Sequence, residues 1–175
     1  MSEPFANMLL EGGKSNSLGR AEEIVQIVLS DQSRLEELYA CLSEDDPWQR
    51  MRAADALEKV CRVHPEWIEP YIEKLLDEHA NNPQPSIQWH MAQIFDQTRL
   101  TSAQEKRIVA WITARLEDPK ADWIVAANTM NTLVTFNTRG LISTDETIRL
   151  VRRQLAHHSN SVVKRATKIL ESMNY

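Results

Sequence analysis

One stretch, residues 46–76, restricts the fold of this chain more than any other: DDPWQRMRAADALEKVCRVHPEWIEPYIEKL. Asp46 followed by Pro47 predicts the start of a helix, because Asp accepts hydrogen bonds from free N–H groups and Pro fits the first helical position. The apolar residues of this helix recur at three-residue spacing, at Met51, Ala54, Leu57 and Val60. Pro65 opens a second helix, whose apolar residues are Ile68, Ile72 and Leu75. The stretch therefore predicts two antiparallel helices joined by a tight turn.

The same hairpin pattern recurs along the chain. Asp118-Pro119 repeats Asp46-Pro47, and it is followed by a second apolar row at Ile124, Ala127, Met130 and Leu133. First helices recur about every 36–39 residues, a period typical of helical-repeat arrays. The sequence predicts a capping segment at 1–17, four helical pairs at about 18–43, 46–79, 84–117 and 118–156, and a terminal helix at 160–173.

A family resemblance rests on the run DPxxRxRAAxAL at 46–57 and on the Pro-initiated second helix. These features resemble the hairpin of HEAT repeats. Arg52 matches the arginine of that repeat, whereas Trp89 takes its place in the third pair. The resemblance implies an all-α fold, an α-solenoid of HEAT-like antiparallel hairpins in one domain, 1–175. HEAT-repeat proteins usually present a surface to another protein, so it also implies a protein-binding scaffold or adaptor.

The N-terminal segment is expected to cap the array. A short helix is predicted at 2–11 and a helix that is apolar nearly all round at 18–30, with Ala21, Ile24 and Ile27 inward. A helix that is apolar on every side must be covered on every side. We therefore expect the first helix to fold back over the second, as terminal caps of repeat arrays do.

The charge distribution argues against a nucleic-acid binder. The net charge is −5; residues 1–138 carry −9 (13 Lys and Arg, 22 Asp and Glu) and residues 139–175 carry +4 (7 Lys and Arg, 3 Asp and Glu). A nucleic-acid-binding protein usually carries a basic stripe along its length. The N-terminus does not resemble a signal peptide, no apolar run is long enough to span a membrane, and Cys41 and Cys61 are isolated. We therefore expect a cytoplasmic protein with reduced cysteines.

No catalytic motif or metal-ligand pattern stands out, so the sequence predicts no cofactor, no metal and no clear enzymatic activity. HEAT-like hydroxylases bind iron through His-Glu dipeptides, and this chain has none. The alternative function is a nucleic-acid-acting protein similar to the HEAT-like alkylpurine glycosylases, for which Trp111, Arg115, Asp122 and Trp123 offer residues of the required types. A chromophore lyase of the HEAT-like type is a further option, which no residue singles out.

The second helices of the pairs supply the candidate binding residues. Aligning them by their inward positions gives outward rows that are acidic or apolar at one end and arginine-rich at the other. The predicted partner-binding residues are Arg149, Arg152, Arg153, Glu73, Asp77, Tyr39, Leu76 and Thr113. Arginine binds carboxylate groups in pairs. The hypothesis is that an acidic segment of a partner protein docks at the three arginines and crosses a region of small residues around Thr113.

The terminal helix at 160–173 presents an apolar row, predicted at Val163, Ala166, Ile169 and Met173. This row either packs on the fourth pair or forms a patch that makes a dimer. The expected state is a monomer or a weak homodimer through the C-terminal helix.

Overall fold

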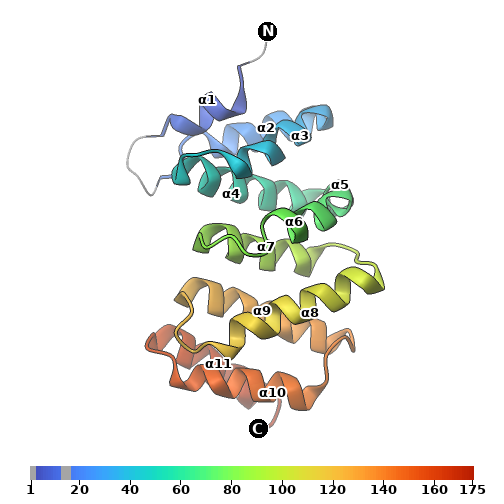
Figure 1. Ribbon diagram of the computed structural model, residues 1–175, viewed down its shortest axis with the longest axis vertical. Coiled ribbons are helices and arrows are strands. Elements are labelled where there is room, and N and C mark those ends of the chain that lie inside the picture. Colours follow the sequence, from blue (N-terminus) through green and yellow to red (C-terminus); the bar gives the residue numbers. More distant parts are fainter. Residues whose placement is uncertain (1–2, 13–16) are drawn as a thin grey trace. The chain divides into compact units, whose positions relative to one another are not determined.

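The computed structural model describes residues 3–12 and 17–175, and these residues form helices and no β-strand (Figure 1). The all-α prediction is confirmed for this part of the chain. None of the described helices is long and apolar enough to span a membrane. The chain divides into two compact units, Met1–Pro70 and Tyr71–Tyr175, and their boundary falls inside the second predicted pair.

Unit 1 is built around its longest helix, α4. Its elements are α1 (Phe5–Leu10), α2 (Ala21–Ser30), η1 (Gln32–Arg34), α3 (Leu35–Ala40), η2 (Cys41–Ser43), α4 (Pro47–Val63) and α5 (Pro65–Ile68). As the sequence predicts, α4 begins at Pro47, because Asp46 Oδ1 accepts hydrogen bonds from the N–H groups of Trp48 and Gln49 at 2.7 and 3.0 Å. Helices α1, α2, α3 and α5 all contact α4.

The first helix packs on α2, as expected, and also on α4. It is shorter than predicted, beginning at Phe5, and it buries Phe5, Met8 and Leu9. Gln49 Nε2 of α4 donates a 2.7 Å hydrogen bond to the Ala6 carbonyl, which ties the two helices together. Residues 1–2 and 13–16 of the predicted capping segment lie outside the described residues. The inward face of α2 differs from the prediction: Val25 and Val28 are buried, whereas Ile27 is only half-buried.

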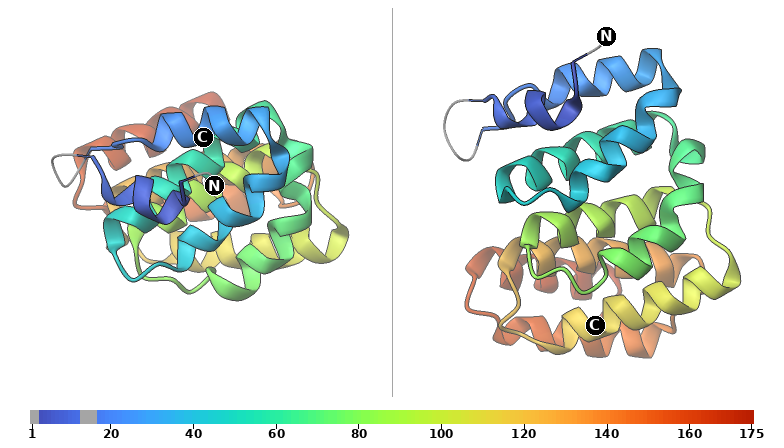
Figure 2. Two further views of the ribbon diagram at one scale, coloured as in Figure 1. Left: turned by 90° about the horizontal axis from the view of Figure 1, so that it is seen from above. Right: turned by 45° about the horizontal axis from the view of Figure 1, so that its top comes forward.

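Unit 2 consists of helices that contact one another in two layers. Its elements are α6 (Ile72–Glu78), α7 (Pro85–Gln97), α8 (Ser102–Glu117), α9 (Trp123–Thr138), α10 (Thr144–Arg153), η4 (Gln154–Ala156) and α11 (Asn160–Ser172). Successive contacts join α7, α9 and α11 in one layer and α6, α8 and α10 in the other, and α9 contacts both α8 and α10. Figure 2 shows these helices from two further directions. This arrangement places the predicted second helices of unit 2 side by side.

Local capping explains where the helices of unit 2 begin. Thr101 and Gln104 form a capping box at the start of α8. The predicted start of the next helix at Pro119 is wrong, because Asp118 Oδ1 accepts the Lys120 N–H in a turn and Asp122 caps α9 instead. Helix α9 ends at a turn in which Gly140 has φ of 75°, a conformation that favours glycine.

The buried face of α11 differs from the predicted row. Val162, Ala166 and Leu170 are buried, at the i, i+4, i+8 spacing of one helix face. Val163, Ile169 and Met173 are half-buried. The inward face is therefore rotated relative to the predicted row, and the two rows share only Ala166.

Candidate partner-binding surface

Most of the predicted binding residues lie on the layer formed by α6, α8 and α10. Glu73, Asp77, Arg149, Arg152 and Arg153 are exposed, and Thr113 is half-buried. Two predicted residues do not line an exposed surface, because Tyr39 and Leu76 are only 3% and 5% exposed. Each follows an inward leucine in the sequence, Leu38 and Leu75, and the apolar stripe of a short helix is wide enough to bury two consecutive positions.

The acidic end of the surface is already paired within the chain. Arg107 on α8 donates to the carboxylates of both Glu73 and Asp77 on α6, and its Nη2 lies 2.6 Å from Asp77 Oδ1. These hydrogen bonds raise the pKa of the Arg107 guanidinium above its ordinary value. One arginine therefore joins two carboxylates one helical turn apart, and α6 is connected to α8.

The arginine end has the reverse arrangement, with one carboxylate between two arginines. Glu117, the last residue of α8, accepts a hydrogen bond from Arg149 and forms an ion pair with Arg153, whose Nε lies 2.9 Å from Glu117 Oε2. Arg153 also donates to the Glu117 carbonyl at 2.8 and 3.0 Å, so it satisfies a carbonyl at the C-terminus of α8. Arg149 binds Glu146 as well, at 2.7 Å.

These contacts change the acidity of both carboxyl groups. The hydrogen bond from Arg149 is the main cause that lowers the pKa of Glu117 and of Glu146 below their ordinary values. The charges of Arg149 and Arg153 are consequently balanced by neighbouring carboxylates. Arg152 is different, since it is exposed and has no ion pair among residues 3–12 and 17–175.

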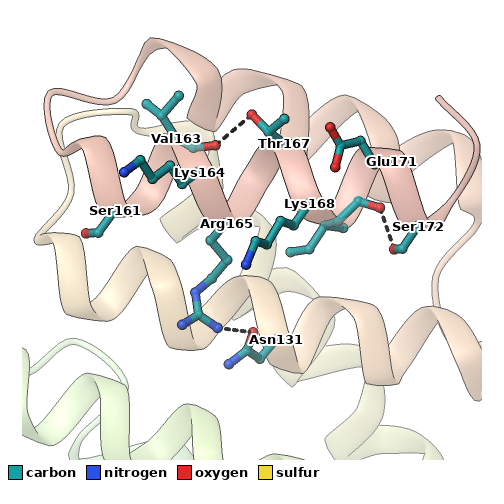
Figure 3. A pocket seen from close by; sticks show the side chains of 10 residues that line it. Asn131, Ser161, Val163, Lys164, Arg165, Thr167, Lys168, Glu171 and Ser172 are labelled. Carbon is teal, nitrogen blue, oxygen red and sulfur yellow. Dashed lines mark hydrogen bonds between the residues drawn. The ribbon is translucent and has the colours of Figure 1, made fainter.

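Helix α11 carries a second cationic surface, which we call the α11 face: Lys164, Arg165 and Lys168 with Asn131 of α9. An open hollow of about 760 Å³ lies over this surface (Figure 3). Arg165 donates a 2.8 Å hydrogen bond to Asn131 Oδ1, a neutral acceptor. In the described part of the chain, neither Lys164 nor Lys168 has a carboxylate within ion-pair distance. This surface was not among the predicted binding residues. Its signals in the sequence were the net charge of +4 over residues 139–175 and the cations at 164, 165 and 168, which lie away from the buried residues of α11.

The residues proposed for the glycosylase alternative have structural roles. Trp111 is buried and donates to the Ala80 carbonyl at 3.1 Å, and Arg115 stacks on the Trp111 ring at 3.8 Å. Arg115 also donates to the Ala80 carbonyl, and burial lowers the pKa of its guanidinium to about 10. Asp122 caps α9. These contacts account for three of the four residues without any reaction.

A smaller hollow of about 320 Å³ lies beside Arg115, and it is lined by two carboxylates, Asp118 and Asp122. Two negative groups around a single guanidinium repel a phosphate. This geometry does not favour a nucleic-acid backbone at that position.

The described residues offer neither a metal site nor a reactive thiol. Across 3–12 and 17–175, no three His, Cys, Asp or Glu side chains are grouped to hold a metal ion. Cys41 and Cys61 are buried and free. Burial raises the pKa of each thiol to about 12, so both remain protonated near neutral pH and are poor nucleophiles.

Comparisons with protein-family models, curated proteins and solved structures gave no significant match. The resemblance to HEAT repeats therefore stays a prediction from the sequence. What the chain does has to be argued from its own surfaces.

Proposed function

We propose that this protein is a small cytoplasmic scaffold or adaptor, an α-solenoid of HEAT-like hairpins with an N-terminal capping helix, which binds an acidic segment of a partner protein. The function is binding alone, without a cofactor. The segment binds unit 2 at the cations that have no carboxylate partner, on α10 and α11.

One observation carries this proposal: the last two α-helices of unit 2, α10 and α11, carry exposed cations that have no matching carboxylate among the described residues. Arg152, Lys164 and Lys168 have no ion pair in the described residues, and Arg165 binds only a neutral amide. By contrast, Arg107, Arg149 and Arg153 are all bound to carboxylates. Unmatched charges leave a local positive potential that attracts and orients an anionic partner.

A protein partner fits this surface better than nucleic acid does. The cations occupy one end of a chain whose net charge is −5, so the rest of the molecule repels a long phosphate backbone. A short acidic segment needs only the local cluster. Carboxylates also suit the guanidinium of Arg165, which can form two parallel hydrogen bonds with one carboxylate.

The test is a titration of the full-length protein at physiological salt with a fluorescent glutamate-rich peptide, a matched glutamine-rich peptide and a DNA duplex of similar charge. We expect binding of the glutamate-rich peptide alone. A triple variant, Arg152→Glu with Lys164→Glu and Lys168→Glu, is expected to lose this binding. Lys106→Glu, a single exposed lysine on α8, is the matched control and should bind normally.

Two results would overturn the proposal. Binding of the duplex that persists at physiological salt, with no binding of the glutamate-rich peptide, would favour the nucleic-acid alternative. Equal binding of the glutamate-rich and glutamine-rich peptides would show that charge does not determine recognition.

A further inference from the structure

The charges, the apolar borders and the acidic end of the α11 face describe the segment that would bind there more closely than its net charge does. Lys164 and Lys168 lie one turn apart on the exposed side of the helix, so their ammonium groups are directed to the same side. Arg165 lies beside them at the edge nearest α9, where its hydrogen bond to Asn131 holds the guanidinium (Figure 3). The cations therefore form a row in which Arg165 is held by a hydrogen bond to α9, while the two lysines are exposed.

Two of the hydroxyl groups around the hollow donate to carbonyls of their own helix, and a third, that of Ser161, is hydrogen-bonded to the Ser159 hydroxyl at 2.8 Å. Thr167 Oγ1 donates to the Val163 carbonyl at 3.0 Å, and Ser172 Oγ donates to the Ile169 carbonyl at 2.7 Å (Figure 3). These donors are already used. The strongest donors left for a ligand in the hollow are the three cations, which select for anionic groups.

Apolar groups border the cations on both sides. Val163 and Ile169 line the hollow and are half-buried, on opposite sides of the buried row that contains Ala166. A ligand that covers them removes apolar surface from water, which stabilises the complex without regard to charge. A free inorganic anion cannot cover them, but a peptide side chain can.

The two ends of the hollow differ in charge, because Glu171, the one acidic residue among the described residues that line it, lies at one end. Glu171 follows Lys168 by three residues, near the C-terminal end of α11. A carboxylate of the ligand is favoured near Lys164, Arg165 and Lys168 and repelled near Glu171. A bound segment therefore gains by placing a lysine or arginine at the Glu171 end.

We propose that the α11 face docks an acidic, partly apolar segment of the partner protein in one orientation, with its carboxylates on Lys164, Arg165 and Lys168, apolar side chains over Val163 and Ile169, and a basic residue at Glu171. This inference rests on the proposed function and assigns its principal site to α11. A second copy of this chain and a nucleic acid are the other occupants to be tested.

The experiment uses the full-length protein and three synthetic peptides measured by fluorescence anisotropy. The first peptide has glutamates and leucines followed by a C-terminal lysine, the second has glutamine in place of glutamate, and the third has the lysine at the N-terminus. Lys164→Glu with Lys168→Glu is expected to weaken binding of the first peptide at least about tenfold, because two favourable contacts become repulsive. Lys106→Glu on α8 is the matched charge reversal outside both cationic helices, and it should leave the binding unchanged. Arg152→Glu on α10 is a separate arm that measures the share of α10 in the binding, and it should weaken the binding less than the double variant does.

The orientation has its own test. Wild-type protein should bind one of the two lysine-tagged peptides more tightly than the other, and Glu171→Lys should remove that preference. Replacement of Arg165 by lysine keeps the charge but loses the planar guanidinium, so it should weaken binding of the acidic peptide less than charge reversal does.

The outcomes show whether the α11 docking site alone is wrong or whether the proposed function is wrong as well. If Arg152→Glu abolishes binding of the first peptide and the α11 variant does not, the docking site is wrong and the proposed function stands. If neither the first nor the third peptide binds wild-type protein, both are wrong. Sedimentation that shows a dimer of the wild type and a monomer of the Lys164→Glu, Lys168→Glu variant would assign this face to a second copy and overturn the docking proposal, as would tighter binding of duplex DNA than of the peptide.

Discussion

Two cationic helices of unit 2, α10 and α11, are amphipathic in the same way, yet among the described residues only α10 has arginines that are matched by carboxylates, at Arg149 and Arg153 but not at Arg152. On α10, Arg149 and Arg153 bind Glu117 at the end of α8. On α11, the corresponding neighbour is Asn131 of α9, an uncharged residue, and Lys164 is left without a carboxylate among the described residues. Amphipathic pattern therefore identifies which face of a helix is exposed, but the adjacent helix decides whether its charges stabilise the fold or remain available to a partner.

The largest expected effect comes from displacing α11 itself. Ala166 is completely buried on the inward face of α11, so Ala166→Leu introduces a side chain for which there is no space. We expect the free energy of unfolding to fall by about 1–3 kcal/mol. Binding of the acidic peptide should weaken as well, because the cations are held by the same helix. Chemical denaturation and anisotropy measure the two effects.

The control for this variant is the same substitution at an exposed alanine. Ala110 lies on the exposed side of α8, and Ala110→Leu should change the free energy of unfolding by less than about 0.5 kcal/mol. An Ala166→Leu variant as stable as Ala110→Leu would show that the buried row of α11 has been assigned to the wrong residues.

The next effect concerns a buried hydrogen bond that joins α8 to η4, the turn directly after α10. Gln154 is fully buried and its Nε2 donates a 2.7 Å hydrogen bond to the Leu116 carbonyl, one of the last carbonyls of α8. Gln154→Ala leaves that carbonyl without its partner, so we expect a loss of about 1–3 kcal/mol in the free energy of unfolding. Thermal and chemical denaturation would measure this loss.

A second variant at the same position separates hydrogen bonding from volume. Gln154→Leu fills most of the space but also lacks the donor, so it should be destabilising yet less so than Gln154→Ala. If Gln154→Leu were as stable as the wild type, the buried hydrogen bond would contribute nothing to the contact between α8 and α10.

Glu117→Gln tests whether the pairing of arginines with carboxylates is the property that distinguishes the α10 face from the α11 face. The change removes the negative charge between Arg149 and Arg153, so α10 gains unmatched cations like those of α11. We expect the acidic peptide to bind the variant a few-fold more tightly than it binds the wild type, with a stronger dependence on salt. The gain should persist when Lys164→Glu and Lys168→Glu are also present. Unchanged affinity would mean that Glu117 does not limit binding at α10.

Much of the helical structure could be predicted because it depends on local sequence. The starts of α4 and α8 follow from Asp46 and Thr101, each of which caps its own helix. The start of α9 was misplaced because Asp118-Pro119 and Asp122 are both plausible caps, and only the backbone conformation decides between them. The α11 row was misplaced because three- and four-residue spacings describe neighbouring faces of one helix.

The candidate site was harder to predict, since it depends on contacts between helices. The sequence correctly placed Glu73, Asp77, Arg149 and Arg153 on the exposed side of their helices. It did not predict that these charges are matched, because Arg107 and Glu117 belong to a different helix and their reach depends on the packing of α8. Charge patterns along one helix do not determine the charge that the neighbouring helix presents.

The smallest expected effect is the pH dependence of the matched face. Hydrogen bonding to Arg149 lowers the pKa of Glu117 in the folded protein below the ordinary value of 4.5. A lowered folded-state pKa stabilises the fold above the unfolded pKa, and this contribution is lost as the pH falls through the folded-state pKa. The wild type should therefore be more stable than Glu117→Gln at neutral pH, and the difference should shrink in acid below about pH 4.5. Because the Glu117 side chain is still 38% exposed, the difference should be small and should diminish at high salt. Denaturant titrations of both proteins at several pH values and low ionic strength measure it, and a difference that stays constant from neutral pH into acid would exclude the Glu117 carboxylate as its source.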